Sequence, residues 1–283
     1  MGNNSFTILP MSQRISLEPG ETYTGKITIV NPVDSTSDFH YKVSVSPYSV
    51  VGQDYTADLT TEYNRSQITN WISIKEPTGS VEPNKSKDVE FTIAVPENAP
   101  AGGQYAAITV SSNDEIQSSD GLAIQNVFEM ASIIYGEVAG ETVHRGKILE
   151  NNVPGFSAAT PVTLSALISN EGNIHEGATF IITVTDVFSG RVILPTEEND
   201  GNFSEVIMPE TTKYITRNVT DLPAIGLIKI SQTIFYNGGS SVVEKNVLIC
   251  PIWFMLLVIL TLASLITTIV MMIKRHKRIK SRV

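Results

Sequence analysis

Residues 89–95 read VEFTIAV, and their side chains alternate between apolar and polar. A period of two residues predicts a β-strand with one face in a core and the other in water. The same alternation recurs in residues 43–45, 162–168, 180–184 and 228–236. Turn-forming residues such as Pro83-Asn84 and Asn98-Ala99-Pro100 separate these stretches. Many short strands joined by such turns predict an all-β fold built from β-sandwiches.

Two short turn motifs each occur twice. The motifs PNKSK at Pro83 and PETTK at Pro209 precede alternating stretches, and their prolines are 126 residues apart. The motifs PAGG at Pro100 and PAIG at Pro223 open later stretches and are 123 residues apart. Such near-equal separations predict two copies of one immunoglobulin-like (Ig-like) plan. We therefore expect a first Ig-like β-sandwich domain over residues 1–139 and a second over residues 140–247.

A long apolar stretch follows the second predicted domain. The 26 residues from Leu248 to Ile273 carry no charge, and about 20 apolar residues suffice to span a bilayer. This predicts one transmembrane α-helix over residues 248–273, with Trp253 placed as an aromatic anchor in the membrane interface. The alternative is a helix buried in a protein core, but no other part of the chain has a pattern able to surround it.

The last ten residues, 274–283, form a basic tail without any acidic residue. Basic flanks of a membrane helix stay in the cytoplasm, so they determine the topology. We expect a single-pass protein of the cell membrane with its N-terminal domains outside the cell and its C-terminus in the cytoplasm. The residues that carry this prediction are Lys274, Arg275, Lys277 and Arg278, followed by Lys280 and Arg282.

The charge balance and the cysteine count exclude several classes of function. The net charge is −9, and six of the 20 basic residues lie in the tail, so the rest of the chain is strongly acidic. Nucleic acid is therefore not an expected partner, because binding it requires a basic face. A single cysteine, Cys250, excludes an internal disulfide and a multi-cysteine zinc site. The four histidines are scattered, so we expect no metal site and no cofactor.

The sequence offers no catalytic pattern. It lacks a G-x-S-x-G nucleophile elbow, and His40, His144 and His175 fall in or beside predicted loops and strands. The acidic pairs Asp114-Glu115 and Glu197-Glu198 fit solvated loop charges, since adjacent carboxylates on a strand or loop point apart. We expect a binding or structural protein, not an enzyme, and the sequence identifies no ligand-binding residue.

Aromatic residues are dense in the first half of the chain. Trp71 is predicted to fill a sandwich core. Most of the five early tyrosines are expected to do the same, although exposed tyrosines would suit glycan or protein binding. They are Tyr23, Tyr41, Tyr48, Tyr55 and Tyr63.

Several motifs resemble one family. SLEPGETYTGKITIVNP (16–32), NWISI (70–74) and VEPNKSKDVEFTIAVPENAPAGGQYAAITVSS (81–112) are similar to the first domain of the WxL-interacting cell-surface proteins of Gram-positive bacteria. LISNEGNIHEGATFIITVTD (167–186) resembles their second Ig-like domain, with NEGNIH from Asn170 to His175 as its most telling part. The resemblance implies an envelope-anchored protein whose first domain is associated with peptidoglycan and whose second is associated with surface or host proteins.

Two functions follow as hypotheses. The first is a membrane-anchored cell-surface binding or scaffold protein that attaches surface proteins or cell-wall polymer (peptidoglycan) at the envelope. Its partners would be surface or secreted proteins, peptidoglycan, and membrane lipid through the C-terminal helix. The alternative is an extracytoplasmic assembly chaperone for exported surface subunits that acts by strand addition. A stable complex on mature cells favours the first hypothesis, and transient complexes with unassembled subunits favour the second.

Overall fold

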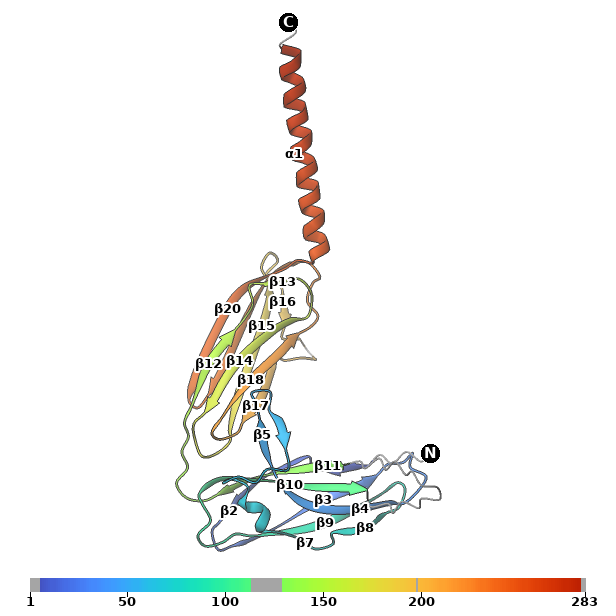
Figure 1. The fold of residues 1–283 in the computed structure, drawn as a ribbon, viewed down its shortest axis with the longest axis vertical. Helices are drawn as coiled ribbons and strands as arrows, with labels where there is room; N and C mark the ends of the chain where they lie inside the picture. Colours follow the sequence, from blue (N-terminus) through green and yellow to red (C-terminus); the bar gives the residue numbers. More distant parts are fainter. Residues whose placement is uncertain (1–5, 113–128, 197, 281–283) are drawn as a thin grey trace. The chain divides into compact units, whose positions relative to one another are not determined.

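The computed structural model describes residues 6–112, 129–196 and 198–280, with side chains described up to Lys274. The chain is mostly β-strand, followed by one C-terminal α-helix (Figure 1). It divides into two compact units. Unit 1 comprises Met1–Gly146, Ser169–Glu176 and Ile207–Lys213, and unit 2 comprises Lys147–Ile168, Gly177–Val206 and Tyr214–Val283. The domain ranges 1–139 and 140–247 remain a prediction about which parts fold independently.

The first set of strands forms two sheets that face each other. One sheet has the order β1 (Thr7–Leu9), β3 (Thr22–Asn31), β9 (Lys85–Ala94), β7 (Ile72–Ile74). The other has the order β2 (Ser12–Leu17), β11 (Glu129–Val138), β10 (Gly102–Ser112), β4 (Phe39–Pro47), β8 (Thr78–Val81). A separate hairpin joins β5 (Ser49–Val51) to β6 (Thr56–Asp58), and a 3₁₀ helix covers Gln67–Asn70.

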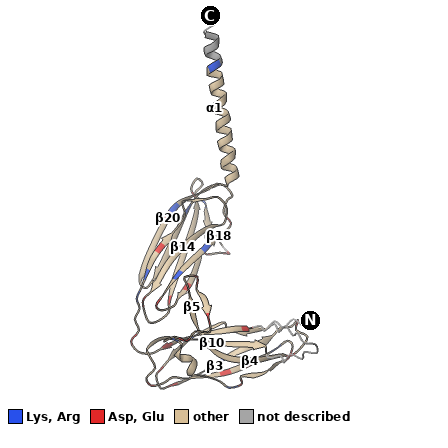
Figure 2. Ribbon diagram, in the orientation of Figure 1, with Lys and Arg blue, Asp and Glu red and all other residues tan. Residues whose placement is uncertain are grey.

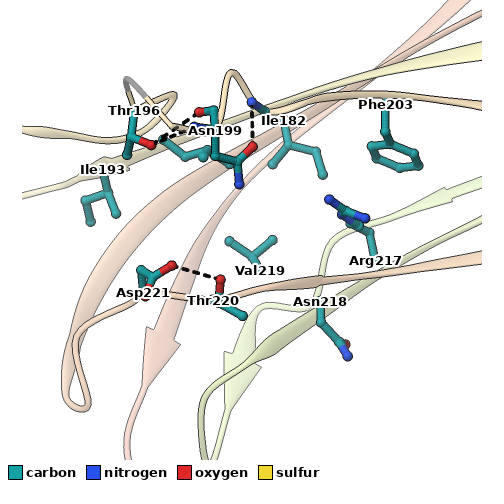
Figure 3. Close-up of a pocket in the computed structure, with 12 residues that line it drawn as sticks. Ile182, Ile193, Thr196, Asn199, Phe203, Arg217, Asn218, Val219, Thr220 and Asp221 are labelled. Carbon is teal, nitrogen blue, oxygen red and sulfur yellow. Dashed lines mark hydrogen bonds between the residues drawn. The ribbon is translucent and has the colours of Figure 1, made fainter. Parts of the chain in front are cut away.

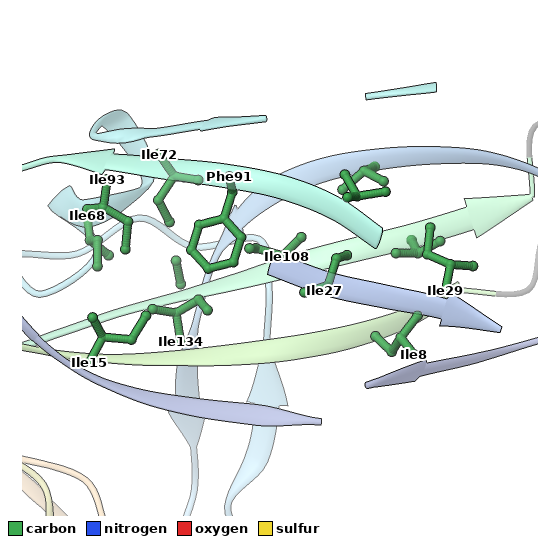
Figure 4. Close-up of a cluster of buried hydrophobic side chains, with 14 of the residues drawn as sticks. Ile8, Ile15, Ile27, Ile29, Ile68, Ile72, Phe91, Ile93, Ile108 and Ile134 are labelled. Carbon is green, nitrogen blue, oxygen red and sulfur yellow. The ribbon is translucent and has the colours of Figure 1, made fainter. Parts of the chain in front are cut away.

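The apolar residues of the alternating stretch 89–95 line one side of the first core. Phe91 and Ile93 on β9 are buried against residues of the opposite sheet, such as Ile108 and Ile134 (Figure 4). Glu90 points outward and pairs with the Lys75 ammonium at 2.8 Å. Both sheets contribute to this apolar cluster, so the first set is a β-sandwich, as the period of two predicted.

The second set of strands forms another sandwich with its own apolar cluster, which includes Leu164, Ile182 and Ile230. Its smaller sheet has the order β12 (Gly146–Asn152), β14 (Val162–Asn170), β18 (Thr211–Val219). Its larger sheet has the order β13 (Phe156–Ser157), β20 (Gly239–Ile249), β19 (Gly226–Tyr236), β15 (Glu176–Asp186), β16 (Val192–Leu194), and β17 (Asn202–Ile207) pairs with β15.

The two sets repeat one strand order. The motif at Pro83 leads into β9 and the motif at Pro209 leads into β18, and these are the third strands of the sheets that begin β1-β3 and β12-β14. The second residues of the two motifs, Asn84 (φ 58°) and Glu210 (φ 59°), share the same left-handed backbone conformation. The motifs PAGG and PAIG open β10 and β19, which hold corresponding places in the larger sheets. The predicted internal repeat is therefore a repeat of turns and strand positions.

The C-terminal helix α1 spans Ile252–Lys280 and begins four residues later than predicted. Leu248 and Ile249 instead finish β20, because Ile249 is buried in the second core and pairs with Gly226. Residues Ile252–Lys274 are long and apolar enough to cross a membrane, with a mean hydropathy of 2.7. Figure 2 shows no charged residue on the described helix before Lys274.

Candidate protein-binding edge and membrane anchor

The histidines expected in loops and strands have different surroundings. His144 pairs through Nδ1 with the carboxylate of Glu176, and His40 lies exposed on β4. Of the acidic pairs, Asp114, Glu115 and Glu197 lie outside the described residues. Within residues 6–112, 129–196 and 198–280, no group of three or more His, Cys, Asp or Glu side chains has a geometry that would hold a metal ion.

His175 lies in a tyrosine-rich cluster inside unit 1. Its backbone N–H donates to the Tyr105 hydroxyl at 3.0 Å, and its ring centre lies 5.1 Å from that of Tyr135. Burial, and secondarily the positive charge of Arg14, lower the pKa of His175 to about 4, so the ring is neutral at pH 7. Burial also raises the pKa of the Tyr105 hydroxyl above its usual range. This cluster is a packed part of unit 1.

The other aromatic residues are mostly core residues, as the sequence predicted. Tyr41 is fully buried, and Tyr23 and Trp71 pack against the first apolar cluster. Tyr63 donates its hydroxyl to the Tyr48 carbonyl at 3.0 Å. Their main contribution is therefore to packing.

Strand β18 provides an open sheet edge in unit 2 over residues 214–219. β18 is the last strand of its sheet, so one row of the backbone N–H and C=O groups of residues 214–219 has no strand partner among the residues described. Ile215 and Val219 point into the sandwich, whereas Arg217 and Asn218 are exposed. The sequence predicted β-strands but did not indicate which of them would be left at an edge.

A cavity of about 240 Å³ lies beside this edge (Figure 3). Its apolar part includes Ile182 and Val219, and its polar part includes Asn199, Arg217 and Asp221. A neighbouring hollow of about 430 Å³ shares Ile193, Thr196 and Asp221 with the cavity. The two together form a groove along one side of unit 2.

The walls of the cavity are held by local contacts. The Arg217 guanidinium lies over the Phe203 ring, 5.0 Å from its centre, and Phe203 stacks on Phe180 at 4.5 Å. On the opposite wall, the Gly201 N–H donates to Asn199 Oδ1 at 3.0 Å. Gly201 has a φ of +73°, and a Cβ there would lie 2.3 Å from the Ile182 carbonyl oxygen. The groove therefore has preformed walls.

Such a groove fits one recognised mode of protein binding. An extended peptide adds to an exposed sheet edge through main-chain hydrogen bonds, and neighbouring pockets accept alternate side chains. The cavity beside β18 has room for one or two side chains and offers both a cation and a carboxylate at its rim. The only feature of the sequence that could have indicated this site is the polar pair Arg217-Asn218 in a stretch that otherwise alternates between apolar and polar residues.

The predicted anchor residues lie on α1. Trp253 is exposed in the first turn of the helix, and Lys274 is exposed near its end. The side chains of Arg275, Lys277 and Arg278 lie outside the described part of the helix. The roles of these five residues in anchoring and topology therefore remain predictions.

No family model and no curated protein matches this chain. Among solved structures, the class 5 fimbriae chaperone CfaA is 13% identical, with a TM-score of 0.41 over 85% of this chain and 99% of that chain. The YadV chaperone is 9% identical, with a TM-score of 0.40 over 85% and 98%. The E. coli chaperone DraB is 13% identical, with a TM-score of 0.38 over 86% and 96%. Similarity at this level supports no statement about function.

Proposed function

We propose that this chain is a membrane-anchored protein that binds an extended segment of another exported protein on the outer side of the cell membrane. The observation that carries the proposal is the open edge of β18 beside a preformed groove. Helix α1 supplies the anchor, because Ile252–Lys274 has the length and composition to cross a bilayer. The basic residues after it are proposed to remain in the cytoplasm.

The incoming segment would extend the sheet β12-β14-β18 by one strand. Its backbone would pair with the outward-facing backbone groups of residues 214–219 of β18, which gives affinity without requiring a particular sequence. Side chains on one face of the segment would enter the groove, where Ile182 and Val219 offer apolar contact. Arg217 and Asp221 would select for polar or charged groups at the rim, which gives specificity.

The scaffold and the chaperone hypotheses are two versions of this proposal that differ in the lifetime of the complex. A scaffold keeps its partner on mature cells, and a chaperone releases its partner once that partner is assembled. The resemblance to WxL-interacting proteins favours a surface protein as partner. Peptidoglycan remains a separate prediction that rests on the resemblance alone.

Site-specific photo-cross-linking in the native membrane tests the binding edge. A benzophenone amino acid replaces Arg217 on β18, and the matched control replaces Lys245, which is also an exposed basic residue, on β20. We expect one exported protein to be captured at position 217 and not at 245, through a single short peptide of that protein. Equal capture at both positions, or none at 217, would contradict the proposal.

The duration of capture separates the two versions. Cross-links that persist at constant yield in mature cells indicate a scaffold, whereas cross-links confined to newly exported partner indicate a chaperone. Sedimentation of the full-length protein with purified cell-wall sacculi is measured in parallel. If it sediments at both low and high salt while position 217 captures nothing, cell-wall polymer replaces protein as the partner.

A further inference from the structure

The second sandwich is tied to helix α1 by a very short connection. The Leu248 N–H donates to the Gly155 carbonyl at 3.1 Å and the Cys250 N–H donates to the Ser157 carbonyl at 3.0 Å, so the chain is fixed to the sandwich as far as Cys250. The helix begins at Ile252. Two residues of chain reach at most about 7 Å. The headgroup layer is about 5–7 Å thick on each side of a bilayer. With α1 spanning a bilayer from Ile252 onward, this end of the sandwich would therefore lie within or directly beside the headgroup layer.

Apolar side chains are exposed at this same end of the sandwich. Leu248 on β20 is paired with Leu227 on β19 and with Phe156 on β13. The Val187 N–H donates to the Leu227 carbonyl at 3.1 Å, which places the β15–β16 turn beside them. Figure 1 shows β13 and β16 at the end of unit 2 from which α1 leaves. Phe156, Val187, Phe188, Ile225 and Leu248 are all exposed.

Phe188 is the most exposed of these residues, at 82%, and it lies in a turn closed by hydrogen bonds. Asp186 Oδ1 accepts hydrogen bonds from the Phe188 N–H at 3.0 Å and from the Ser189 N–H at 2.7 Å. Gly190, with a φ of +69°, closes the turn by donating its N–H to the Asp186 carbonyl at 3.0 Å. These hydrogen bonds fix the backbone of the turn that carries the exposed Phe188 ring.

We propose that this apolar end of the second sandwich sits in the lipid headgroup layer, with Phe188 at its deepest point. The inference rests on the proposed function, because it requires α1 to span the membrane. An exposed apolar cluster is unfavourable in water and is stabilised where it meets the boundary of headgroups and acyl chains. Lipid is the occupant that the geometry favours, since the tether keeps this cluster next to the bilayer whatever else is bound. The seat would hold the β18 edge at a fixed height above the membrane.

The test uses the full-length chain in phosphatidylcholine vesicles. Cys250 is the only cysteine, so a Cys250→Ser background allows single labels to be placed with Phe188→Cys or with Phe235→Cys. Phe235 is the matched control, because it is a 46% exposed phenylalanine at the far end of β19, beside the turn into β20. An environment-sensitive nitrobenzoxadiazole dye is attached at each site, and its emission and its quenching by headgroup-nitroxide lipids are measured.

We expect the label at position 188 to emit at shorter wavelength and to be quenched about threefold more strongly than the label at position 235. Equal emission and quenching at the two sites would overturn the proposal that this apolar end lies in the headgroup layer, which we call the lipid seat. Alkaline carbonate extraction of the same vesicles separates this failure from that of the anchor. If the chain resists extraction while the labels behave alike, only the seat is refuted. If the chain is extracted, α1 does not span the membrane, and the seat and the anchored function fail together.

Discussion

Each strand set has a buried asparagine at the equivalent strand end. Among the residues described, both the nitrogen and the oxygen of the side-chain amide are hydrogen-bonded in only one of the two. Asn31 ends β3 and Asn170 ends β14, and each is 1% exposed. The Asn31 amide donates to the Ser37 and Val81 carbonyls at 3.0 and 2.9 Å. The Asn170 amide donates to the Ile174 and Ile207 carbonyls at 2.8 and 3.0 Å. Val81 and Ile207 each lie two residues before the proline of the repeated turn motif.

The difference lies in the side-chain oxygens. Oδ1 of Asn170 accepts the Gly172 N–H at 2.9 Å, whereas Oδ1 of Asn31 is buried and has no hydrogen-bond partner among the residues that the structure describes. The connection after Asn170 spans only residues 171–175 and turns back onto the asparagine, whereas the one after Asn31 spans residues 32–38. The hydrogen bonds that the asparagine side chain donates are therefore common to both strand sets, whereas the hydrogen bond that it accepts depends on the following loop.

The largest expected effects test whether the two sets have independent cores. Phe91→Ala in the first core and Ile230→Ala in the second should each cost about 4 kcal/mol of unfolding free energy, because each leaves a cavity. We expect hydrogen exchange of the full-length chain in detergent micelles to speed up in β3 and β9 for the first variant and in β15 and β20 for the second. Val33→Ala, at an exposed position, is the control. If both variants open both sets equally, the two sets form one cooperative unit.

The stability cost of removing each buried asparagine should increase with the number of buried backbone groups that its side chain hydrogen-bonds. At about 1 kcal/mol for each buried backbone group left without a partner, Asn170→Ala should cost about 3 kcal/mol and Asn31→Ala about 2 kcal/mol. Denaturant unfolding of the two variants measures the difference, with Asn246→Ala on the exposed face of β20 as the reference. An Asn31→Ala cost equal to or above that of Asn170→Ala would remove the distinction between the loops.

The loop after Asn170 should make the folding stability depend on pH, because it contains His175. The loop after Asn31 contains no histidine and should not have this effect. The pKa of His175 is about 4 in the folded chain, against about 6.5 when unfolded. The unfolded state binds the proton more readily between these values, so stability should fall as the pH drops from about 6.5 to about 4, by less than about 1.4 kcal/mol per pH unit. His175→Gln should flatten the stability profile in this window. An unchanged slope would assign the titration to another group.

The smallest expected effect concerns the paired left-handed residues. Asn84→Ala should cost about 1 kcal/mol, because alanine tolerates the left-handed conformation less well than asparagine does. Glu210→Asn should change stability by less than about 0.5 kcal/mol, since the gain in backbone conformation offsets the lost ion pair to Arg65, whose side chain is 13% exposed. Thermal unfolding measures both variants. Stabilisation by Glu210→Asn comparable to the cost of Asn84→Ala would mean that the ion pair contributes nothing.

The local pattern of residues predicts several of the strands and the apolar helix. The VEFTIAV alternation predicted which side chains of β9 are buried, because the two faces of a strand depend only on a period of two. The uncharged run after Leu248 predicted an apolar helix, since length and hydropathy are local properties. The repeated proline motifs predicted a duplicated plan, because a turn is specified by a few adjacent residues.

Features that depend on partners distant in the chain follow only from the tertiary structure. Leu248 and Ile249 belong to β20 and not to the helix, because β19 and β13 offer them backbone partners. The same holds for the roles of Asn31 and His175, whose partners lie up to 70 residues away in the chain. The open edge at residues 214–219 of β18 and the groove beside it follow from the order of strands in the sheets. Strand order arises from long-range pairing between segments, which a local pattern of residues does not encode.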